Sequence, residues 1–496
     1  MKNHLTNIAA NFLGQFFSIL ISLIFIPFYM NALGAESYGL IALYTSLQVA
    51  ISIFDIGLSP AMSKEAARFK SGKISNSYFT SLLRSTELVY LLIMIFILII
   101  GFLFARFIAN QWFITETYST NQIKNLLIII SLLLGLRLVE EFYRSILRGF
   151  DDHIWLNKFT SLISFLRWGG AFFLLLLIDK TLKFFFIIQC AISIFAIILY
   201  LSKVYNSLPK TTKITKFNIK SLSQIRKFSA GMSVIGFTSF ILNQADKLLL
   251  SGYIDLSHYG YYMIAVTITS GVAQLVAPIS LSIYPKFVSL ISNNETNNIK
   301  NIFNISSQLI SLCIIPLSIV LMFFSKETLF AWTGNTALTL YSYPILQILL
   351  LTNLVNSLAS MPYILQISYG VTRLTIINNV IAIIFYLLPM FFIINKYGLF
   401  VLLCWSLLIN IILTFLSINF TFKRFFYGKI KYWFYKSFLI PIAISTICIF
   451  FLRLCYFELG NKIFTILYLF GSVVLTILLN LYFMPNVKKY ILHVSK

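Results

Sequence analysis

Apolar residues fill most of the chain in runs of about 20, and short polar stretches separate these runs. A run of this length is what an α-helix needs to cross the hydrocarbon core of a bilayer. Because a helix satisfies its backbone hydrogen bonds internally, the pattern predicts an all-α integral membrane protein with about 14 transmembrane helices. We place these helices near residues 8–30, 38–60, 86–106, 123–147, 159–178, 184–202, 228–250, 259–284, 304–324, 341–365, 374–394, 398–420, 437–456 and 463–483.

The longest polar interruption, residues 203–227, contains seven lysines and arginines and no acidic residue. Cytoplasmic loops of membrane proteins carry an excess of such cations, so this stretch is predicted to be a cytoplasmic loop. The other connections that follow even-numbered runs also hold many cations, whereas the connections on the opposite side hold few. The distribution predicts that the N- and C-termini both lie in the cytoplasm.

Six apolar runs precede the basic loop, which suggests two lobes of equal size and the same orientation. We predict an N-lobe at residues 1–202, a basic linker at 203–227, a C-lobe at 228–420, and two C-terminal helices with a tail at 421–496. ESYGLIALYTS after the first run has a counterpart in SHYGYYMIAVTITS after the seventh, with Tyr38-Gly39 aligned to Tyr259-Gly260. Parallel halves are a transporter architecture with a central cleft, although a match this short also fits chance.

Composition supports a bilayer environment, since 59% of residues are hydrophobic and 11% are charged. The formal net charge of +23 comes from residues between apolar runs and not from one basic face. We therefore expect membrane lipids with anionic headgroups as partners, and no nucleic acid.

Motifs for catalysis and for nucleotide binding are absent from the sequence. It contains no G-x-x-x-x-G-K-[ST] phosphate loop, no H-E-x-x-H and no G-x-S-x-G. All five cysteines fall inside apolar runs, where a thiol behaves as a small hydrophobe. We expect no cofactor, no metal site and no catalytic centre.

The fourth run is the richest in charge. Arg137, Glu141, Arg144 and Arg148 are spaced by 4, 3 and 4 residues, which places them on one helical face about 16 Å long. Either this face lines a cavity, or Arg144 and Arg148 reach the cytoplasmic interface while Glu141 pairs with Arg137 or Arg144. The depth of Arg137 favours the cavity.

Arg167 lies midway along the fifth run, in SFLRWGG. A charge at this depth needs a partner or a wet cavity. Arg167 is therefore a candidate for holding an anion inside the membrane, or for a structural pair with an acid such as Glu140.

Several other charged residues leave two interpretations open. Asp55 is a candidate for ion coupling or for capping a helix, and Glu87 for ion coupling or for pairing with Arg84. Asp246 and Lys247 are adjacent and point about 100° apart on a helix, so each needs another partner or a wet position.

A family resemblance extends in order over about the first four hundred residues. The chain resembles the bacterial flippases of O-antigen and other oligosaccharide repeat units, the Wzx type of polysaccharide exporter. The stretches that carry it are YMNALGAESYGLIALYTSL, FDIGLSPAMSKEAAR, LRGFDDHIWLN, NQADKLLLSGY, YGYYMIA, IYPKF, LFAWTG, MPYILQISYGVTRL and KYGL. That superfamily also includes multidrug-and-toxin extruders and the lipid II flippase.

The resemblance implies two six-helix lobes in a V around a cationic cavity, with alternating access. It also implies a cargo of oligosaccharide on undecaprenyl diphosphate, moved from the cytoplasmic to the periplasmic leaflet of the bacterial inner membrane. Two departures stand out. Residues 401–403 are Val-Leu-Leu where members often have Gly-Ala-Ala, and the first run has Asn11, Gln15 and Ser18 where the lipid II flippase carries arginines. The second departure argues against a peptidoglycan cargo.

We therefore expect a flippase in which Arg137, Arg144, Arg148 and Arg167 contact diphosphate or glycan. Membrane potential is one driving force for export. A proton or sodium gradient acting through an acid is another, and the candidates for coupling or pairing are Asp55, Glu87, Glu140, Glu141 and Asp246, with Lys247 as a further candidate. The alternatives are an ion-coupled multidrug exporter and a membrane glycosyltransferase or glycan polymerase. A glycan polymerase and a chain-length regulator are expected partners.

Overall fold

The computed structural model of the chain describes residues 2–55, 57–209, 219–371, 373–426, 430–456, 462–485 and 487–488. Every regular element in these ranges is a helix, which confirms the predicted all-α class. Residues 210–218, in the middle of the predicted basic linker, and 489–496 of the tail lie outside the described residues. The chain forms two compact units, Met1–Gly260 and Tyr261–Lys496, which we call the first and the second unit. The lobe boundaries expected from the apolar runs stay a prediction.

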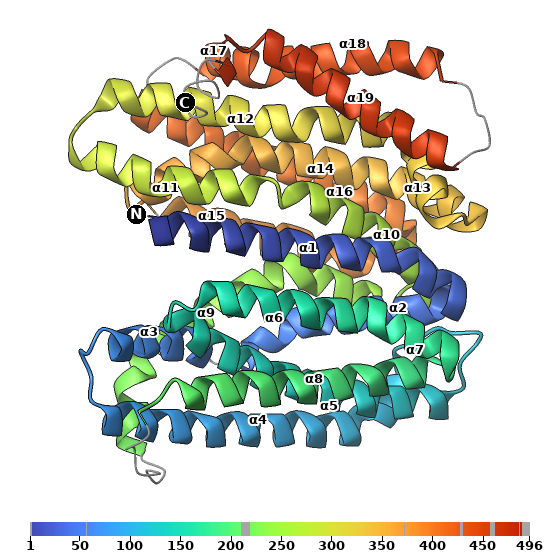
Figure 1. The fold of residues 1–496 in the computed structure, drawn as a ribbon. Helices are drawn as coiled ribbons and strands as arrows, with labels where there is room; N and C mark the ends of the chain where they lie inside the picture. Colours follow the sequence, from blue (N-terminus) through green and yellow to red (C-terminus); the bar gives the residue numbers. More distant parts are fainter. Residues whose placement is uncertain are drawn as a thin grey trace. The chain divides into compact units, whose positions relative to one another are not determined.

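The first unit is built from nine helices and the start of a tenth. They are α1 (Lys2–Leu33), α2 (Ala35–Ala50), α3 (Leu58–Lys70), α4 (Asn76–Gln111), α5 (Thr120–Gly149), α6 (His153–Phe165), α7 (Ala171–Leu177), α8 (Leu182–Asn206), α9 (Ile219–Leu250) and α10 (Leu256–Ala273). Helix α5 packs against α3, α4 and α8, and α1 packs against α6 (Figure 1). The side of α5 that faces its neighbours buries Leu133, Phe142 and Ile146 completely.

The second unit contains the rest of α10 and nine further helices. These are α11 (Val276–Ser292), α12 (Thr296–Phe323), α13 (Ser325–Thr333), α14 (Thr336–Ser368), α15 (Arg373–Ala382), α16 (Leu388–Thr421), α17 (Ile430–Phe434), α18 (Ile440–Leu454) and α19 (Lys462–Tyr482). The last two helices, α18 and α19, pack against each other and against α12.

The second predicted span is not one helix. Helix α2 ends in a short 3-10 turn, Ile51–Ile53, and α3 begins at Leu58 after Gly57, which has a φ of 64°. Glycine adopts this left-handed conformation without the steric cost that a side chain brings. The Asp55 carboxylate accepts hydrogen bonds from Ser59 N–H at 3.2 Å and Ser59 Oγ at 2.6 Å, in the first turn of α3. Asp55 thus has the capping contacts that were one of its two predicted interpretations.

The fifth predicted span contains a π turn, Leu166–Gly170, between α6 and α7. A π turn leaves backbone carbonyls without their usual helical partners, and such turns are frequent at functional sites. Here side chains take over, since Tyr29 Oη donates to Trp168 O at 2.6 Å and Gln189 Nε2 donates to Arg167 O at 2.8 Å. The turn therefore fixes the backbone that carries Arg167.

Two copies of the Tyr-Gly motif meet in the first unit. A Cβ placed on Gly39 of α2 would lie 2.3 Å from Leu256 O, and one on Gly260 of α10 would lie 2.8 Å from Ala35 O. Both distances are too short for any side chain, so the contact requires glycine on each helix. The segments that look alike in sequence thus pack backbone to backbone.

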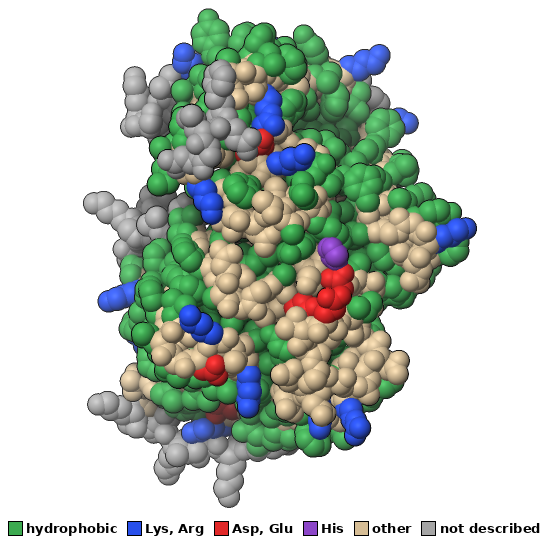
Figure 2. Space-filling model, turned by 90° about the vertical axis from the view of Figure 1, so that its right-hand side faces the viewer, with side chains coloured by type: hydrophobic (Ala, Val, Ile, Leu, Met, Phe, Trp, Pro, Cys, Tyr) green, Lys and Arg blue, Asp and Glu red, His purple; other side chains and the backbone are tan. Residues whose placement is uncertain are grey.

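Nine stretches of the described helices are long and apolar enough to cross a membrane. Helix α5, whose 30 residues include six charged ones, is not among them. Large apolar side chains point outward, with Leu177 81% and Leu281 73% exposed. Figure 2 shows apolar side chains over much of one face, between scattered charged groups. The chain is a multi-pass membrane protein, and the number of about 14 helices stays a prediction.

Candidate functional site

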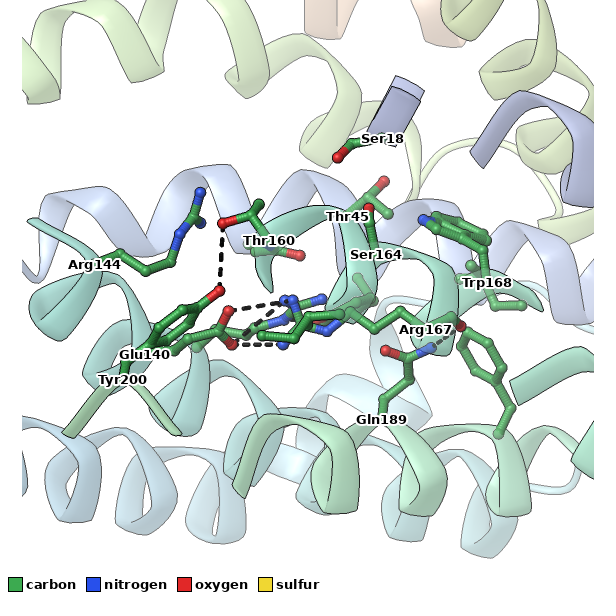
Figure 3. A pocket seen from close by; sticks show the side chains of 16 residues that line it. Ser18, Thr45, Glu140, Arg144, Thr160, Ser164, Arg167, Trp168, Gln189 and Tyr200 are labelled. Atoms are coloured by element: carbon green, nitrogen blue, oxygen red, sulfur yellow. Dashed lines mark hydrogen bonds and ion pairs between the residues drawn. The ribbon is translucent and has the colours of Figure 1, made fainter. Parts of the chain in front are cut away.

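The first unit encloses a polar cavity of about 290 Å³. Its walls come from α1, α2, α5, α6, α8 and the π turn (Figure 3). The lining residues are Ser18, Ile41, Tyr44, Thr45, Gln48, Arg137, Glu140, Arg144, Thr160, Ile163, Ser164, Arg167, Trp168, Phe185, Gln189 and Tyr200. Charged and hydroxyl-bearing side chains from helices far apart in the sequence thus surround one space.

A buried ion pair joins α5 to the π turn. Arg167 Nη2 lies 2.5 Å from Glu140 Oε2, and Nη1 donates to Oε1 at 3.3 Å. Glu140 is 2% exposed and Arg167 8%, so neither charge has access to much water. Ser193 Oγ accepts a further hydrogen bond from Arg167 Nη2 at 3.2 Å. The two-pronged contact provides the compensation that charges at this depth require.

Arg137 lies on the other side of the same carboxylate. Its Nη1 is 3.6 Å from Glu140 Oε2, and its Nε donates to Tyr44 Oη on α2 at 2.9 Å. Figure 3 shows Glu140 among guanidinium groups, with Tyr200 and Thr160 hydrogen-bonded at one end of the cavity and Gln189 at the other. One acid therefore serves two arginines.

Positive charge exceeds negative charge in the lining. Arg137, Arg144 and Arg167 contribute three positive charges and Glu140 one negative charge, so the difference is +2. The Nε atoms of Arg144 and Arg167 are buried and have no hydrogen-bond partner within the described part of the chain. An excess of guanidinium groups in a cavity lining suits an anion that offers several oxygens.

Three of the four predicted arginines line the cavity, and the fourth does not. Arg148 is half-exposed and lies 2.5 Å from Glu141, which also holds Arg144 at 2.9 Å. Neither Arg148 nor Glu141 belongs to the lining found in the described residues. The predicted pairing of Glu141 with Arg144 is present, whereas Arg137 pairs with Glu140 instead.

The remaining predicted acids lie outside this lining as the structure describes it. Asp55 also accepts a hydrogen bond from Tyr90 Oη. Glu87 pairs with Arg84 at 3.1 Å, as one interpretation expected. Asp246 and Lys247 lie on α9, where Lys247 Nζ donates to Asn243 O one turn earlier. Their roles in ion coupling stay predictions.

The sequence did not reveal the neutral part of the site. Tyr44, Gln48, Thr160, Gln189 and Tyr200 line the cavity from three helices. The only available signal was an isolated polar residue inside an apolar run, and many such residues elsewhere merely join helices.

The fold and the cavity define a polytopic helical membrane protein with a cationic interior site. Its family follows from sequence comparison. The profile of the polysaccharide biosynthesis protein family matches residues 4–291, so the chain belongs to this family. A putative O-antigen transporter from Shigella flexneri is 22% identical over 417 residues, which cover 84% of this chain and 96% of the relative. The resemblance read from the sequence is thereby confirmed.

Two solved structures show the same fold. The lipid II flippase MurJ, in an inward closed conformation, matches with a TM-score of 0.73 at 19% identity, over 96% of this chain and 98% of that chain. An inward-facing multidrug resistance MATE family transporter of the MOP superfamily matches with a TM-score of 0.63 at 12% identity, over 84% of this chain and 95% of that chain. These relatives are named as transporters or flippases and not as enzymes, in agreement with the prediction for this chain.

Proposed function

We propose that the chain is a flippase for oligosaccharide repeat units on undecaprenyl diphosphate. It would move them from the cytoplasmic to the periplasmic leaflet of the bacterial inner membrane by alternating access. The observation that carries the proposal is the arginine-rich cavity inside a membrane unit, with its charge of +2. Its relatives in sequence and fold include a putative O-antigen transporter and a lipid II flippase, which supports a cargo that joins a lipid to a glycan.

A diphosphate diester matches this site in charge and in hydrogen bonding. Its charge of about −2 balances the cavity, and its oxygens accept from guanidinium groups, which favour such two-pronged contacts. The volume of about 290 Å³ lies near the lower end for ligand sites of about 300 to 1,000 Å³. The cavity therefore suits the diphosphate and the sugar next to it, with the rest of the glycan outside.

Glu140 explains how the empty site tolerates its arginines. Without cargo, the carboxylate neutralises Arg167 at 2.5 Å and lies 3.6 Å from Arg137. An incoming diphosphate would replace this internal anion at one or both guanidinium groups. Loading at Arg167 is then an exchange of one anion for another, while Glu140 keeps its contact with Arg137, so no bare charge is left in the low-dielectric interior.

The membrane potential is sufficient to help drive export. Moving two negative charges outward across about 100 mV, negative inside, releases up to about 4.6 kcal/mol. Coupling to a proton or sodium gradient through an acid stays an alternative. The two driving forces can be told apart by collapsing the membrane potential and the ion gradient separately while the rate of flipping is measured.

The test is transport in proteoliposomes. Undecaprenyl-diphosphate oligosaccharide is placed in one leaflet, and its arrival in the other is read with an impermeant glycan-modifying enzyme. We expect transfer with the wild-type protein and at least a tenfold lower rate with Arg167→Ala, because the main partner of the diphosphate is lost.

Arg148→Ala is the matched control, since Arg148 lies on α5, the helix that carries Arg137 and Arg144, but outside the cavity lining. Absence of transfer by folded wild-type protein with its native glycan would reject the flippase. Such a result would favour the multidrug exporter, although a cavity with a net charge of +2 repels cationic drugs.

A further inference from the structure

A second cavity lies in the first unit, where α4 and α8 flank α5. It has a volume of about 500 Å³ and shares no lining residue with the arginine-rich cavity. Most of its lining is apolar, from Leu88, Leu91, Met94, Leu136, Val139 and Ile197. Leu88 and Leu91 are 47% and 50% exposed, so the cavity opens to the surroundings of the helices as a groove. In a membrane protein those surroundings are lipid.

A compact polar cluster closes one end of this groove. The Glu87 carboxylate accepts from Tyr143 Oη at 3.0 Å, Tyr205 Oη at 2.8 Å and Arg84 Nη1 at 3.1 Å. The Arg84 guanidinium also lies over the Tyr205 ring, 4.9 Å from its centre. Three helices therefore hold Arg84 in one orientation.

Most of the hydrogen-bonding capacity of Arg84 is unused. A guanidinium has five N–H donors, and the contact with Glu87 is the one hydrogen bond that Arg84 makes to the described residues. Its side chain is 40% exposed, so these donors face outward from the cluster. Guanidinium groups recognise phosphate through such donors.

Along the groove a polar end is followed by an apolar length, which is also the order of headgroup and hydrocarbon chain in a lipid. On α4, residues 84, 88, 91 and 94 fall on one face and extend over about 15 Å, from an arginine to purely apolar side chains. A phospholipid presents the same order, with a phosphate followed by a hydrocarbon chain. With the predicted cytoplasmic N-terminus, Arg84 lies toward the cytoplasmic surface, where headgroups are found.

We propose that this groove is a specific binding site for a glycerophospholipid of the cytoplasmic leaflet. The lipid phosphate contacts Arg84, and one acyl chain lies along Leu88, Leu91 and Met94. Glu87 and the two tyrosines position the guanidinium. The long apolar lining assigns the site to a lipid, because inorganic phosphate alone would leave it uncovered.

The test uses phosphatidylglycerol with a photoreactive group in its acyl chain, reconstituted with the purified protein in vesicles. Sites of labelling are mapped by peptide mass spectrometry. We expect labelling on α4 around Leu91 and Met94 in the wild-type protein. The Leu91→Trp variant should lower this labelling about tenfold, because the larger side chain fills the groove. The Leu92→Trp variant should leave the labelling unchanged, because Leu92 is 55% exposed and lies outside the groove lining.

A second pair of variants tests the headgroup contact. Arg84→Gln should lower labelling about tenfold, the usual effect of losing a hydrogen bond to a charged group, whereas Arg106→Gln near the other end of α4 should leave it unchanged. A diacylglycerol probe with the same chain should label weakly, and excess inorganic phosphate should not displace the phospholipid. Normal gel-filtration profiles establish that the variants are folded. If Arg84→Gln does not fold, the comparison of Leu91→Trp with Leu92→Trp still decides whether a lipid chain occupies the groove.

Equal labelling in Leu91→Trp and Leu92→Trp would overturn the proposal in favour of ordinary lipid contact. Equal labelling by diacylglycerol would overturn the phosphate contact, and displacement by inorganic phosphate would reassign the site to the free anion. The proposal does not depend on flippase activity, so it stands or falls separately.

Discussion

The two units bury polar groups in different ways. The first unit buries charges, among them Glu36, Glu140 and Arg167, whereas every buried polar side chain in the described part of the second unit is neutral. In the second unit Gln366 Nε2 on α14 donates to Thr421 Oγ1 on α16 at 2.8 Å, and Asn480 Nδ2 on α19 donates to Ser445 Oγ on α18 at 2.8 Å. These neutral contacts join neighbouring helices and leave no charge in need of a partner.

The difference shows what buried charges are needed for. A helix bundle in lipid can be held together by packing and neutral hydrogen bonds that contribute about 0.6 kcal/mol each on average. Buried ions cost much more to desolvate, and replacing them by apolar groups is often neutral or stabilising. The excess of positive charge in the cavity lining is therefore a cost in stability, which fits the anion binding proposed above. The following predictions test this contrast.

The largest effect is expected from breaking the central ion pair. Arg167→Ala leaves the buried Glu140 carboxylate with only Arg137, at 3.6 Å, and should lower the free energy of unfolding by about 3 to 5 kcal/mol. Replacing both partners, as in Glu140→Gln with Arg167→Gln, should restore part of the loss, because the buried carboxylate is gone and Arg137 keeps its hydrogen bond to Tyr44 Oη. Thermal unfolding in detergent measures the stability of the single and of the double variant. A double variant as unstable as Arg167→Ala would show that the pair itself is structural.

A smaller effect is expected at Glu36, a buried charge that binds its own chain. The Glu36 carboxylate accepts hydrogen bonds from Thr115 Oγ1 at 2.6 Å, Glu116 N–H at 2.9 Å and Thr117 N–H at 3.1 Å. It thereby ties the connection between α4 and α5 to the start of α2. Glu36→Ala should lower the free energy of unfolding by about 2 to 3 kcal/mol, whereas Glu116→Ala, which keeps its backbone N–H, should have little effect.

The contribution of Glu36 should depend on pH. Burial alone would raise its pKa, but the three hydrogen bonds outweigh burial and hold the pKa below the ordinary value of 4.5. A lowered pKa stabilises the folded protein at pH values above 4.5, and this contribution is lost as the pH falls through the folded pKa. The difference in unfolding temperature between wild type and Glu36→Ala should therefore shrink in acid. A constant difference across that range would contradict the assignment.

The fold class was predictable because the length and composition of the apolar runs determine it. The charged part of the site was partly predictable for a related reason. Arg137 and Arg167 lie at depths where a charge needs a partner, and Glu140 was a predicted partner of Arg167. The helix breaks were not predictable, because the π turn at Leu166–Gly170 leaves the apolar pattern unchanged. Arg148 shares the predicted face of α5 but lies outside the cavity lining of the described residues, since periodicity does not show where a cavity ends. Its expected contact with cargo stays a prediction.

A further prediction concerns Glu140 as the internal anion of the cavity. Glu140→Gln removes the carboxylate that competes with cargo and raises the charge of the cavity lining from +2 to +3. Inorganic pyrophosphate should therefore bind about tenfold more tightly, which corresponds to about 1.4 kcal/mol. Isothermal titration of the purified protein gives the Kd. Glu141→Gln is the matched control, because this neighbouring acid lies outside the lining, and equal changes in the two variants would argue against direct competition.

The smallest effect is expected in the second unit. Gln366→Leu keeps the volume of the side chain but removes the amide that donates to Thr421 Oγ1 at 2.8 Å and Ser417 Oγ at 3.2 Å. Thr421 Oγ1 keeps a partner, since it donates to Ser417 O at 2.8 Å, and only the Ser417 hydroxyl loses its hydrogen bond to the described residues. The free energy of unfolding should therefore fall by only about 0.6 kcal/mol. Transport should be nearly unchanged, because a neutral contact between α14 and α16 holds helices and does not hold cargo. Unfolding and flipping measured on the same preparation test both statements. A loss of flipping as large as that of Arg167→Ala, with stability kept, would place cargo contacts in the second unit and end the contrast between the two interiors.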